Sequence, residues 1–204
     1  AKCFFITIGF KLILGLFVQS AMAQPSTLKV LKKPNIINDF ELLDQSGKPF
    51  GLANLKNQWS LVFLGFTHCP DICPLTMSKL EAVRAELGSH FTPDKIPNIV
   101  FVGVDPDRDK PIIADYLKHF HPKNIGVTGD AYQLDILVKS VDGFYRLDKK
   151  SPTATSKYYN VVHTSSIAVI NPKAEMIAKI SPPFNVSTVS RDLMLLIRRG
   201  HLDE

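Results

Sequence analysis

The chain has 204 residues, of which 45% are hydrophobic and 21% charged, so it has the composition of one ordinary globular domain and is neither disordered nor collagen-like. Its 24 basic and 19 acidic residues give a formal charge of +5, but they are spread along the chain and do not form the basic cluster typical of nucleic-acid-binding proteins. Three cysteines are too few for a small fold held together by disulfides. We therefore expect any important cysteine to take part in chemistry.

The N-terminal segment has the layout of a signal peptide. Residues 3–18 are almost entirely apolar, follow a lysine, and lead to an A-x-A pattern that ends at Ala23. An uncleaved membrane anchor and a buried helix are the alternatives, but a central lysine interrupts the stretch, which is shorter than the about 20 residues that span a bilayer. Residues 1–23 thus predict export to the periplasm, or an anchor that faces it, and cleavage would leave Cys69 and Cys73 as the remaining cysteines.

Apolar periodicity and turn residues predict an alternating order of elements. In the first half these are an irregular arm at residues 24–37, hairpin strands at 38–43 and 48–52, a buried strand at 59–66, a helix at 74–87 that begins at Pro74, and a strand at 99–104. In the second half they are a helix through Phe120 capped by Asp109, a strand at 125–128, a helix to about Val141 capped by Asp130, a surface loop to 159, hairpin strands at 165–170 and 175–180, and a helix at 186–199.

This order of elements defines a fold class. Strands that alternate with helices require right-handed crossovers and a sheet covered on both faces. Two cysteines follow the first central strand, and an antiparallel hairpin and a helix close the chain. We therefore predict an α/β protein with a thioredoxin-like fold over residues 38–204, with an N-terminal β-hairpin and a loop insertion before the penultimate strand.

Cys69 and Cys73 form a C-x-x-x-C motif at the strand-to-helix junction. Residues four apart in a helix hold their Cβ atoms about 5–6 Å apart, whereas a disulfide needs about 3.5–4.5 Å, so we expect Cys69 on the turn before the helix. A thiol at a helix N-terminus has a lowered pKa, and its thiolate is a nucleophile and a soft ligand for Cu(I) or Zn(II). The motif can thus bind a metal when reduced and release it when oxidised. A structural disulfide and a general redox pair are the alternatives.

A third metal ligand beside the two thiolates must be a histidine, a methionine or a carboxylate, because no further cysteine remains. Four of the six histidines lie at predicted helix ends or in polar loops, where a solvated or capping role is the simpler interpretation: His90, His119, His121 and His201. His68 adjoins Cys69 and would be strained if it shared the same metal. His163 leads into the penultimate strand, which lies against the cysteine turn in a thioredoxin-like fold. His163 is therefore the predicted third ligand, and a role in capping the strand is the alternative.

Three motifs in this order resemble the Sco (SenC) family of copper-binding proteins for cytochrome c oxidase assembly. They are residues 66–74 (FTHCPDICP), residues 104–109 (VDPDRD) and His163 before T-S-S, and the similarity covers about residues 36–198. The resemblance implies that Cys69, Cys73 and His163 bind one copper ion, as Cu(I) or Cu(II), for delivery to the dinuclear copper site of oxidase subunit II. Some members of the family instead reduce the cysteines of that site.

One residue departs from the family pattern. An aspartate usually precedes the histidine, and Val162 takes its place here, so we expect a less firmly held imidazole. The segment 104–109 is better explained by loop architecture and helix capping than by a metal site.

Two functions from different classes fit these observations. We favour a copper chaperone, and the alternative is an exported thiol-disulfide oxidoreductase that acts on cysteine pairs of partner proteins and is recycled by a thioredoxin-like reductant. A copper or redox sensor is a third interpretation. We expect a monomer whose partners are oxidase subunit II or other copper and dithiol proteins, and we expect no nucleic-acid partner. His163 discriminates between the first two functions, because disulfide exchange needs only the cysteines.

Overall fold

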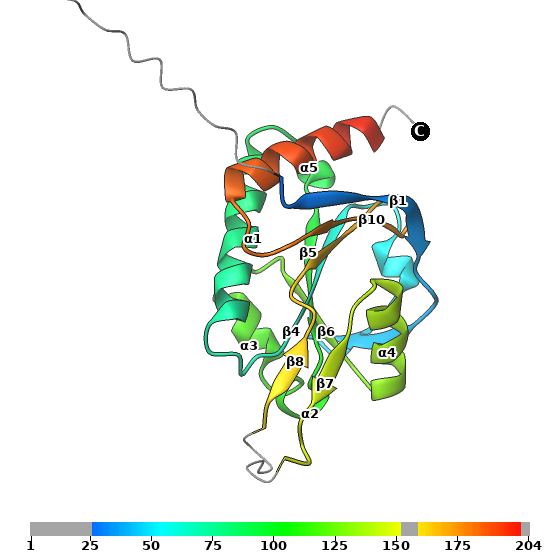
Figure 1. Ribbon diagram of the computed structural model, residues 1–204, viewed down its shortest axis with the longest axis vertical. Coiled ribbons are helices and arrows are strands. Elements are labelled where there is room, and N and C mark those ends of the chain that lie inside the picture. Colours follow the sequence, from blue (N-terminus) through cyan, green and yellow to red (C-terminus); the bar gives the residue numbers. More distant parts are fainter. Residues whose placement is uncertain (1–25, 152–158, 201–204) are drawn as a thin grey trace, which may run out of the picture.

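The computed structural model describes residues 26–151 and 159–200, which form a central sheet with helices on both faces (Figure 1). The main sheet has eight strands in the order β1-β10-β9-β4-β5-β6-β2-β3, and β7 and β8 form a separate two-stranded sheet. The strands are β1 (Leu28–Ile36), β2 (Glu41–Asp44), β3 (Pro49–Gly51), β4 (Ser60–Gly65), β5 (Asn98–Gly103), β6 (Ile125–Thr128), β7 (Tyr145–Leu147), β8 (Val161–His163), β9 (Ile167–Ile170) and β10 (Glu175–Ile180). The helices are α1 (Ile72–Gly88), α2 (Pro106–Asp109), α3 (Ile113–Lys118), α4 (Ala131–Ser140) and α5 (Val186–Gly200), with short 3-10 turns at η1 (Leu52–Leu55) and η2 (Pro93–Lys95).

The centre of the sheet is buried on both faces. Strands β4, β5 and β6 are parallel, and all six residues of β4 are buried. Alternate side chains of β4 enter two hydrophobic cores, because successive residues of a strand point to opposite faces. Phe63 packs with residues of α1, α3 and α5, whereas Leu64 packs with residues of α4. This layered architecture confirms the predicted α/β class with its thioredoxin-like arrangement.

Most of the predicted elements lie close to their expected positions. The β2–β3 hairpin, the three parallel strands, the β9–β10 hairpin and the final helix are all present, and β6 covers the predicted residues. Asp130 caps α4 as expected, since its carboxylate accepts hydrogen bonds from the backbone N–H groups of Tyr132 and Gln133, each at 3.0 Å.

The expectation of an irregular arm over residues 24–37 is wrong. Residues 28–36 form β1, the edge strand of the main sheet, which pairs antiparallel with β10. Because one long edge of this strand faces solvent, it carries lysines and Pro34 and lacks the apolar alternation of a buried strand. Its register with β10 also shifts between Val30 and Asn35, which interrupts the pattern further.

Two predicted helix starts are also corrected. Helix α1 begins at Ile72 and not at Pro74. The helix expected after Asp109 corresponds to α3, which begins only at Ile113, and Asp109 is the last residue of the separate short helix α2 and not a cap. Pro106 starts α2 because a proline is well suited to the first helical turn, and the carboxylate of Asp109 is directed into the protein instead.

Parts of the expected organisation lie outside the described residues. These are the predicted signal peptide or anchor at residues 1–23 and residues 152–158 of the predicted surface loop. The described part of that loop contains β7, which pairs with β8 at the end of the molecule where α2 lies (Figure 1). Within residues 26–151 and 159–200, no helix is both long and apolar enough to cross a membrane.

Candidate metal centre

The cysteine motif occupies the junction between β4 and α1. The chain turns directly after β4, where the backbone N–H of Cys69 donates to the carbonyl of Phe66 at 3.2 Å. Cys69 lies on this turn, as predicted, and Cys73 lies in the first turn of α1. The backbone N–H of Cys73 points to the Cys69 sulfur, with an N···Sγ distance of 3.4 Å. A free N–H group at the helix N-terminus is thus directed at the first thiol, and both cysteines are unbridged.

The two thiols have different environments. Cys73 is fully buried, whereas Cys69 is partly exposed. Burial raises the pKa of the Cys73 thiol, and the neighbouring Cys69 adds to this effect. The lowered pKa expected at a helix N-terminus therefore does not hold for Cys73, because loss of hydration outweighs the helix dipole there. Without a metal, the Cys73 sulfur carries a proton at neutral pH.

Strand register brings the predicted histidine to this turn. Strand β9 lies antiparallel to β4, and Phe63 near the end of β4 pairs with Ile167 at the start of β9. The residues just before Ile167 must therefore lie beside the turn that follows β4. His163, 90 positions after Cys73, has its Nε2 at 3.8 Å from the Cys73 sulfur. His163 is the last residue of β8, so it belongs to a strand rather than to a free loop.

The histidine is oriented for ligation. Its Nδ1 lies 3.0 Å from the carbonyl oxygen of Thr164. A carbonyl can only accept, so Nδ1 carries the proton and Nε2 presents its lone pair to the sulfur. The ring is held edge-on by Phe63 and Phe66, at centroid distances of 6.2 and 6.0 Å. Burial lowers the pKa of His163, so the neutral ring, the form that binds metals, predominates at neutral pH.

We expected a less firmly held imidazole because Val162 replaces the aspartate of the family pattern, and the carbonyl of Thr164 is the group that holds the ring here. Val162 is 44% exposed, and its side chain points to the opposite face of the strand from His163. The imidazole is therefore anchored by the main chain in this protein, despite the change from the family pattern at this position.

The other histidines that the structure describes lie in solvated or helix-end positions, as predicted. His68 and His90 are exposed, and His68 Nδ1 lies 3.2 Å from the hydroxyl of Thr67. The ring of His119 contacts the backbone of its own helix, and His121 accepts a hydrogen bond from a backbone N–H two residues later. His201 lies outside the described residues.

A carboxylate that the sequence indicated only as a helix cap supports the cysteine turn. Asp109 is fully buried and accepts hydrogen bonds from both the backbone N–H and the hydroxyl of Thr67, each at 2.7 Å. Its second oxygen accepts from the backbone N–H of Asp105 at 2.9 Å. Gly103 makes room for this carboxylate, since a Cβ there would lie 2.8 Å from it. Burial raises the pKa of Asp109. The segment 104–109 thus has an architectural role, as predicted, although Asp109 supports the cysteine turn and does not cap a helix.

A tyrosine next to the cysteines was not predicted from the sequence. Tyr116 of α3 packs on Phe101 at a centroid distance of 5.3 Å, and its buried hydroxyl has no hydrogen-bond partner in the described structure. Burial, followed by the charges of Cys73 and Cys69, raises its pKa. Its sequence context is that of an ordinary amphipathic helix, so no sequence signal could have identified it.

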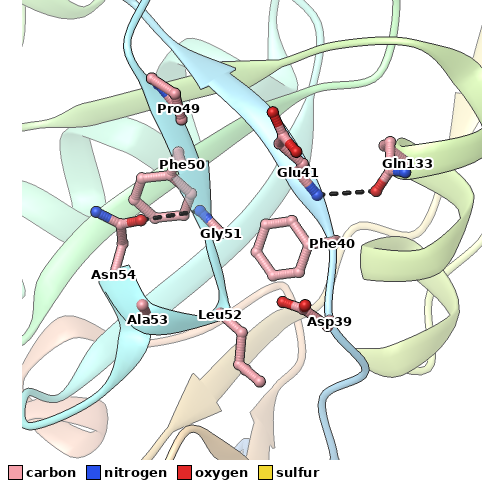
Figure 2. Close-up of a pocket in the computed structure, with 10 residues that line it drawn as sticks. All are labelled: Asp39, Phe40, Glu41, Pro49, Phe50, Gly51, Leu52, Ala53, Asn54 and Gln133. Atoms are coloured by element: carbon pink, nitrogen blue, oxygen red, sulfur yellow. Dashed lines mark hydrogen bonds between the residues drawn. The ribbon is translucent and has the colours of Figure 1, made fainter.

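Two hollows differ in their relation to this centre. One, of about 400 Å³, adjoins it and is lined mainly by apolar groups, including Ile72, Leu75 and Phe184, with Ser165 from the segment after His163. The other, of about 410 Å³, lies between β2, β3, η1 and α4, and its acidic side chains are Asp39 and Glu41 (Figure 2). The second hollow contains no thiol or imidazole among its lining residues, so it offers no soft ligand.

The three candidate donor atoms lie near one another but do not have the geometry of a complete metal site. Among the residues that the structure describes, no three His, Cys, Asp or Glu side chains are arranged as a complete metal site. Cys73 and His163 face each other, and Cys69 is held one turn away by the N–H of Cys73. Binding through all three donors therefore requires a rearrangement of side chains.

Fold and site together define a thioredoxin-like protein with two thiols and an imidazole at the end of a central strand. The chain belongs to the SCO1/SenC family, whose profile matches residues 29–198. The resemblance drawn from the three sequence motifs is thereby confirmed.

Individual relatives agree with this assignment. The chain is 45% identical over 108 residues to the SCO2-like protein of Rickettsia felis. The aligned region covers 52% of this chain and 51% of that protein, so the chain spans about half the length of this relative. Arabidopsis thaliana ScoI, solved with copper bound, has a TM-score of 0.71 at 29% identity and covers 80% of this chain and 99% of that chain. Yeast Sco1 with copper bound has a TM-score of 0.73 at 26% identity, with coverages of 81% and 90%.

Proposed function

We propose that this protein binds one copper ion through Cys69, Cys73 and His163 and delivers it to the dinuclear copper site of cytochrome c oxidase subunit II. The observation that supports this most strongly is the 3.8 Å approach of His163 Nε2 to the Cys73 sulfur, with the Nδ1 proton turned to Thr164. Relatives of similar fold have been solved with copper bound, and the Sco family is described as one of cytochrome c oxidase assembly proteins.

The donor set fits copper as cargo. Thiolates are soft ligands and imidazole suits copper in both oxidation states, whereas calcium and magnesium prefer oxygen ligands. The Cys73 thiol, whose pKa is raised by burial, must give up its proton when it binds the ion. Copper binding therefore releases protons, and affinity for copper increases with pH while this thiol is protonated in the free protein.

Release to a partner follows from the arrangement of the donors. Cys69 is partly exposed, so an incoming ligand has a route to the ion. His163 is carried by a different segment from the cysteines and can leave the ion without disturbing α1. We propose that residues 1–23 direct the chain to the periplasm and that the copper-accepting protein binds it there.

A thiol-disulfide oxidoreductase is the second candidate, favoured by the N–H of Cys73 that points to the Cys69 sulfur. In that reaction the Cys69 thiolate attacks a partner disulfide and forms a mixed disulfide. Cys73 then attacks the Cys69 sulfur, which releases the partner as a dithiol and leaves a Cys69–Cys73 disulfide. A thioredoxin-like dithiol protein must reduce that disulfide before the next cycle.

Copper titration of the reduced protein tests the favoured function. We expect saturation near one equivalent of Cu(I) and, with Cu(II), a thiolate-to-copper charge-transfer band. Replacement of either thiol, by Cys69→Ser or Cys73→Ser, should abolish both signals, and oxidation to the disulfide should eject the ion. His68→Ala, which alters an exposed residue beside Cys69, is the matched control and should bind like the wild type. Unchanged binding in the serine variants would refute the proposed site.

A further inference from the structure

Three residues next to the centre contact one another in a way that the proposed function does not use. The guanidinium of Arg108 lies over the ring of Tyr159, with Cζ 3.8 Å from the ring centroid, and it forms an ion pair with Asp105. The hydroxyl of Tyr159 donates to the other oxygen of Asp105 at 2.7 Å. A second nitrogen of Arg108 donates to the Tyr159 carbonyl at 3.4 Å. We call Asp105, Arg108 and Tyr159 the clasp.

Burial makes the clasp more than a surface ion pair. Asp105 is fully buried, and a buried carboxylate is stable only when charged or hydrogen-bonding groups satisfy its oxygens. Arg108 and Tyr159 supply those groups, one to each oxygen. Burial and the hydrogen bond to Asp105 raise the pKa of Tyr159 to about 12, so its hydroxyl keeps the proton that it donates.

The clasp connects the two segments that carry the proposed ligands. Arg108 also lies 5.7 Å from the ring centroid of Phe66, the residue whose carbonyl accepts from the N–H of Cys69. Tyr159 is four residues before His163. One arginine from a third segment, the short helix α2 after β5, thus contacts both the start of the cysteine turn and the entry to the histidine strand.

The clasp adds a polar anchor to the histidine strand, whose Val161 also packs against a hydrophobic core. Strands β7 and β8 have three residues each and pair only with one another among the described strands. A two-stranded sheet of this length is at best marginally stable by itself. Through Tyr159, the segment that carries His163 is hydrogen-bonded to the fully buried carboxylate of Asp105.

We propose that Arg108 is a positioning residue that holds His163 against Cys73, and that opening of the clasp frees the histidine when copper is released. This inference rests on the proposed function, since it assigns a role to the release of one of its ligands. In the free protein the clasp restricts the motion of β8. In the loaded protein it keeps His163 from leaving the copper ion. Its loss therefore affects Cu(II), which needs the imidazole, more than Cu(I), which two thiolates can satisfy.

The first test uses copper-free protein. We expect hydrogen exchange of the Asp148 and Thr164 amides, which bond across the strand pair, to be faster in Arg108→Gln than in the wild type. Since Arg108→Gln leaves a buried carboxylate without its cation and can unfold the protein, Arg108→Lys is the second variant. Lysine keeps the charge beside Asp105 but cannot stack as a planar group. Arg146→Lys is the matched control, because Arg146 lies on β7, is 60% exposed and is not part of the clasp.

The second test measures transfer of Cu(II) to a chelator in the same variants. We expect Arg108→Lys to release Cu(II) about tenfold faster than the wild type, with a smaller change in Cu(I) affinity. Arg146→Lys should match the wild type in both tests. The proposed role of the clasp would be refuted if Arg108→Lys had the amide exchange rates and the Cu(II) release rate of the wild type. It would also be refuted if Arg146→Lys changed both rates as much as Arg108→Lys does. If the wild type binds no copper, the proposed function fails, while the exchange measurement still decides whether Arg108 restricts the histidine strand.

Discussion

The side chains of the centre are tuned by burial more than by charge. Burial raises the pKa of Cys73 and lowers that of His163, so both shifts favour the neutral form of the side chain. A neutral thiol beside a neutral imidazole avoids an uncompensated charge in the interior before a metal arrives. A bound copper ion reverses this preference for Cys73, because the cation stabilises the thiolate.

The raised pKa of Cys73 predicts its reactivity. The thiolate is the reactive form, so labelling of Cys73 by iodoacetamide should be slow at pH 7 and should rise about tenfold per pH unit up to pH 9. The exposed fraction of Cys69 predicts that it is labelled first. Mass spectrometry of the Cys69 and Cys73 peptides from reduced, metal-free protein measures both rates. A Cys73 rate that levels off below pH 8 would mean that its pKa is lowered rather than raised.

At the scale of elements, the cysteine turn is supported by the loop that follows the neighbouring strand. Asp109 satisfies three donors on these two segments, which belong to the ends of the parallel strands β4 and β5. The two loops are therefore fixed relative to each other by one buried carboxylate. The clasp continues the same connection to β8, so three segments share one group of buried polar contacts.

Loss of the Asp109 carboxylate should be costly for this reason. Asp109→Ala leaves buried donors of Thr67 and Asp105 unsatisfied, and we expect the free energy of unfolding to fall by about 2–4 kcal/mol. Urea unfolding followed by circular dichroism measures this change. Asp107→Ala is the control from the same segment, since the side chain of Asp107 is 74% exposed, and it should have little effect. Equal stability of the two variants would show that Asp109 does not support the turn.

The elements that the sequence predicted are those with a strong local signal. β4 and β5 are continuous apolar runs, and Asp130 marks the start of α4 by its capping side chain. β1 was missed because its lysines suit an exposed edge, and three-residue strands such as β7 and β8 are too short to show alternation. Helix α2 and the inward position of Asp109 at its end were missed, because the buried hydrogen bonds of Asp109 are tertiary contacts that no local pattern reports.

At the scale of the molecule, the centre exists because the topology brings distant segments to one end of the sheet. The antiparallel register of β4 and β9 places the residues before Ile167 beside the cysteine turn. The three candidate ligands could be predicted from motif spacing and from this general arrangement of strands. The contacts of Tyr159 with Asp105 and Arg108 could not, because they depend on side-chain packing between segments more than 50 positions apart that no motif marks.

The whole account depends on His163 as a copper ligand, which His163→Ala tests most directly. We expect the variant to fold and to form the Cys69–Cys73 disulfide as the wild type does. Among the described residues, the ring has polar contacts only with Cys73 and Thr164, so its removal breaks no hydrogen bond within the main sheet. It should lose most of its Cu(II) affinity and retain part of its Cu(I) affinity, because two thiolates alone can satisfy linear Cu(I).

Comparative titration of wild type and His163→Ala with both ions is therefore the decisive measurement. A large loss of Cu(II) affinity with a partial loss for Cu(I) is the result that the structure predicts. Equal Cu(II) affinity in the two proteins would remove His163 from the site and favour the oxidoreductase in place of the copper chaperone.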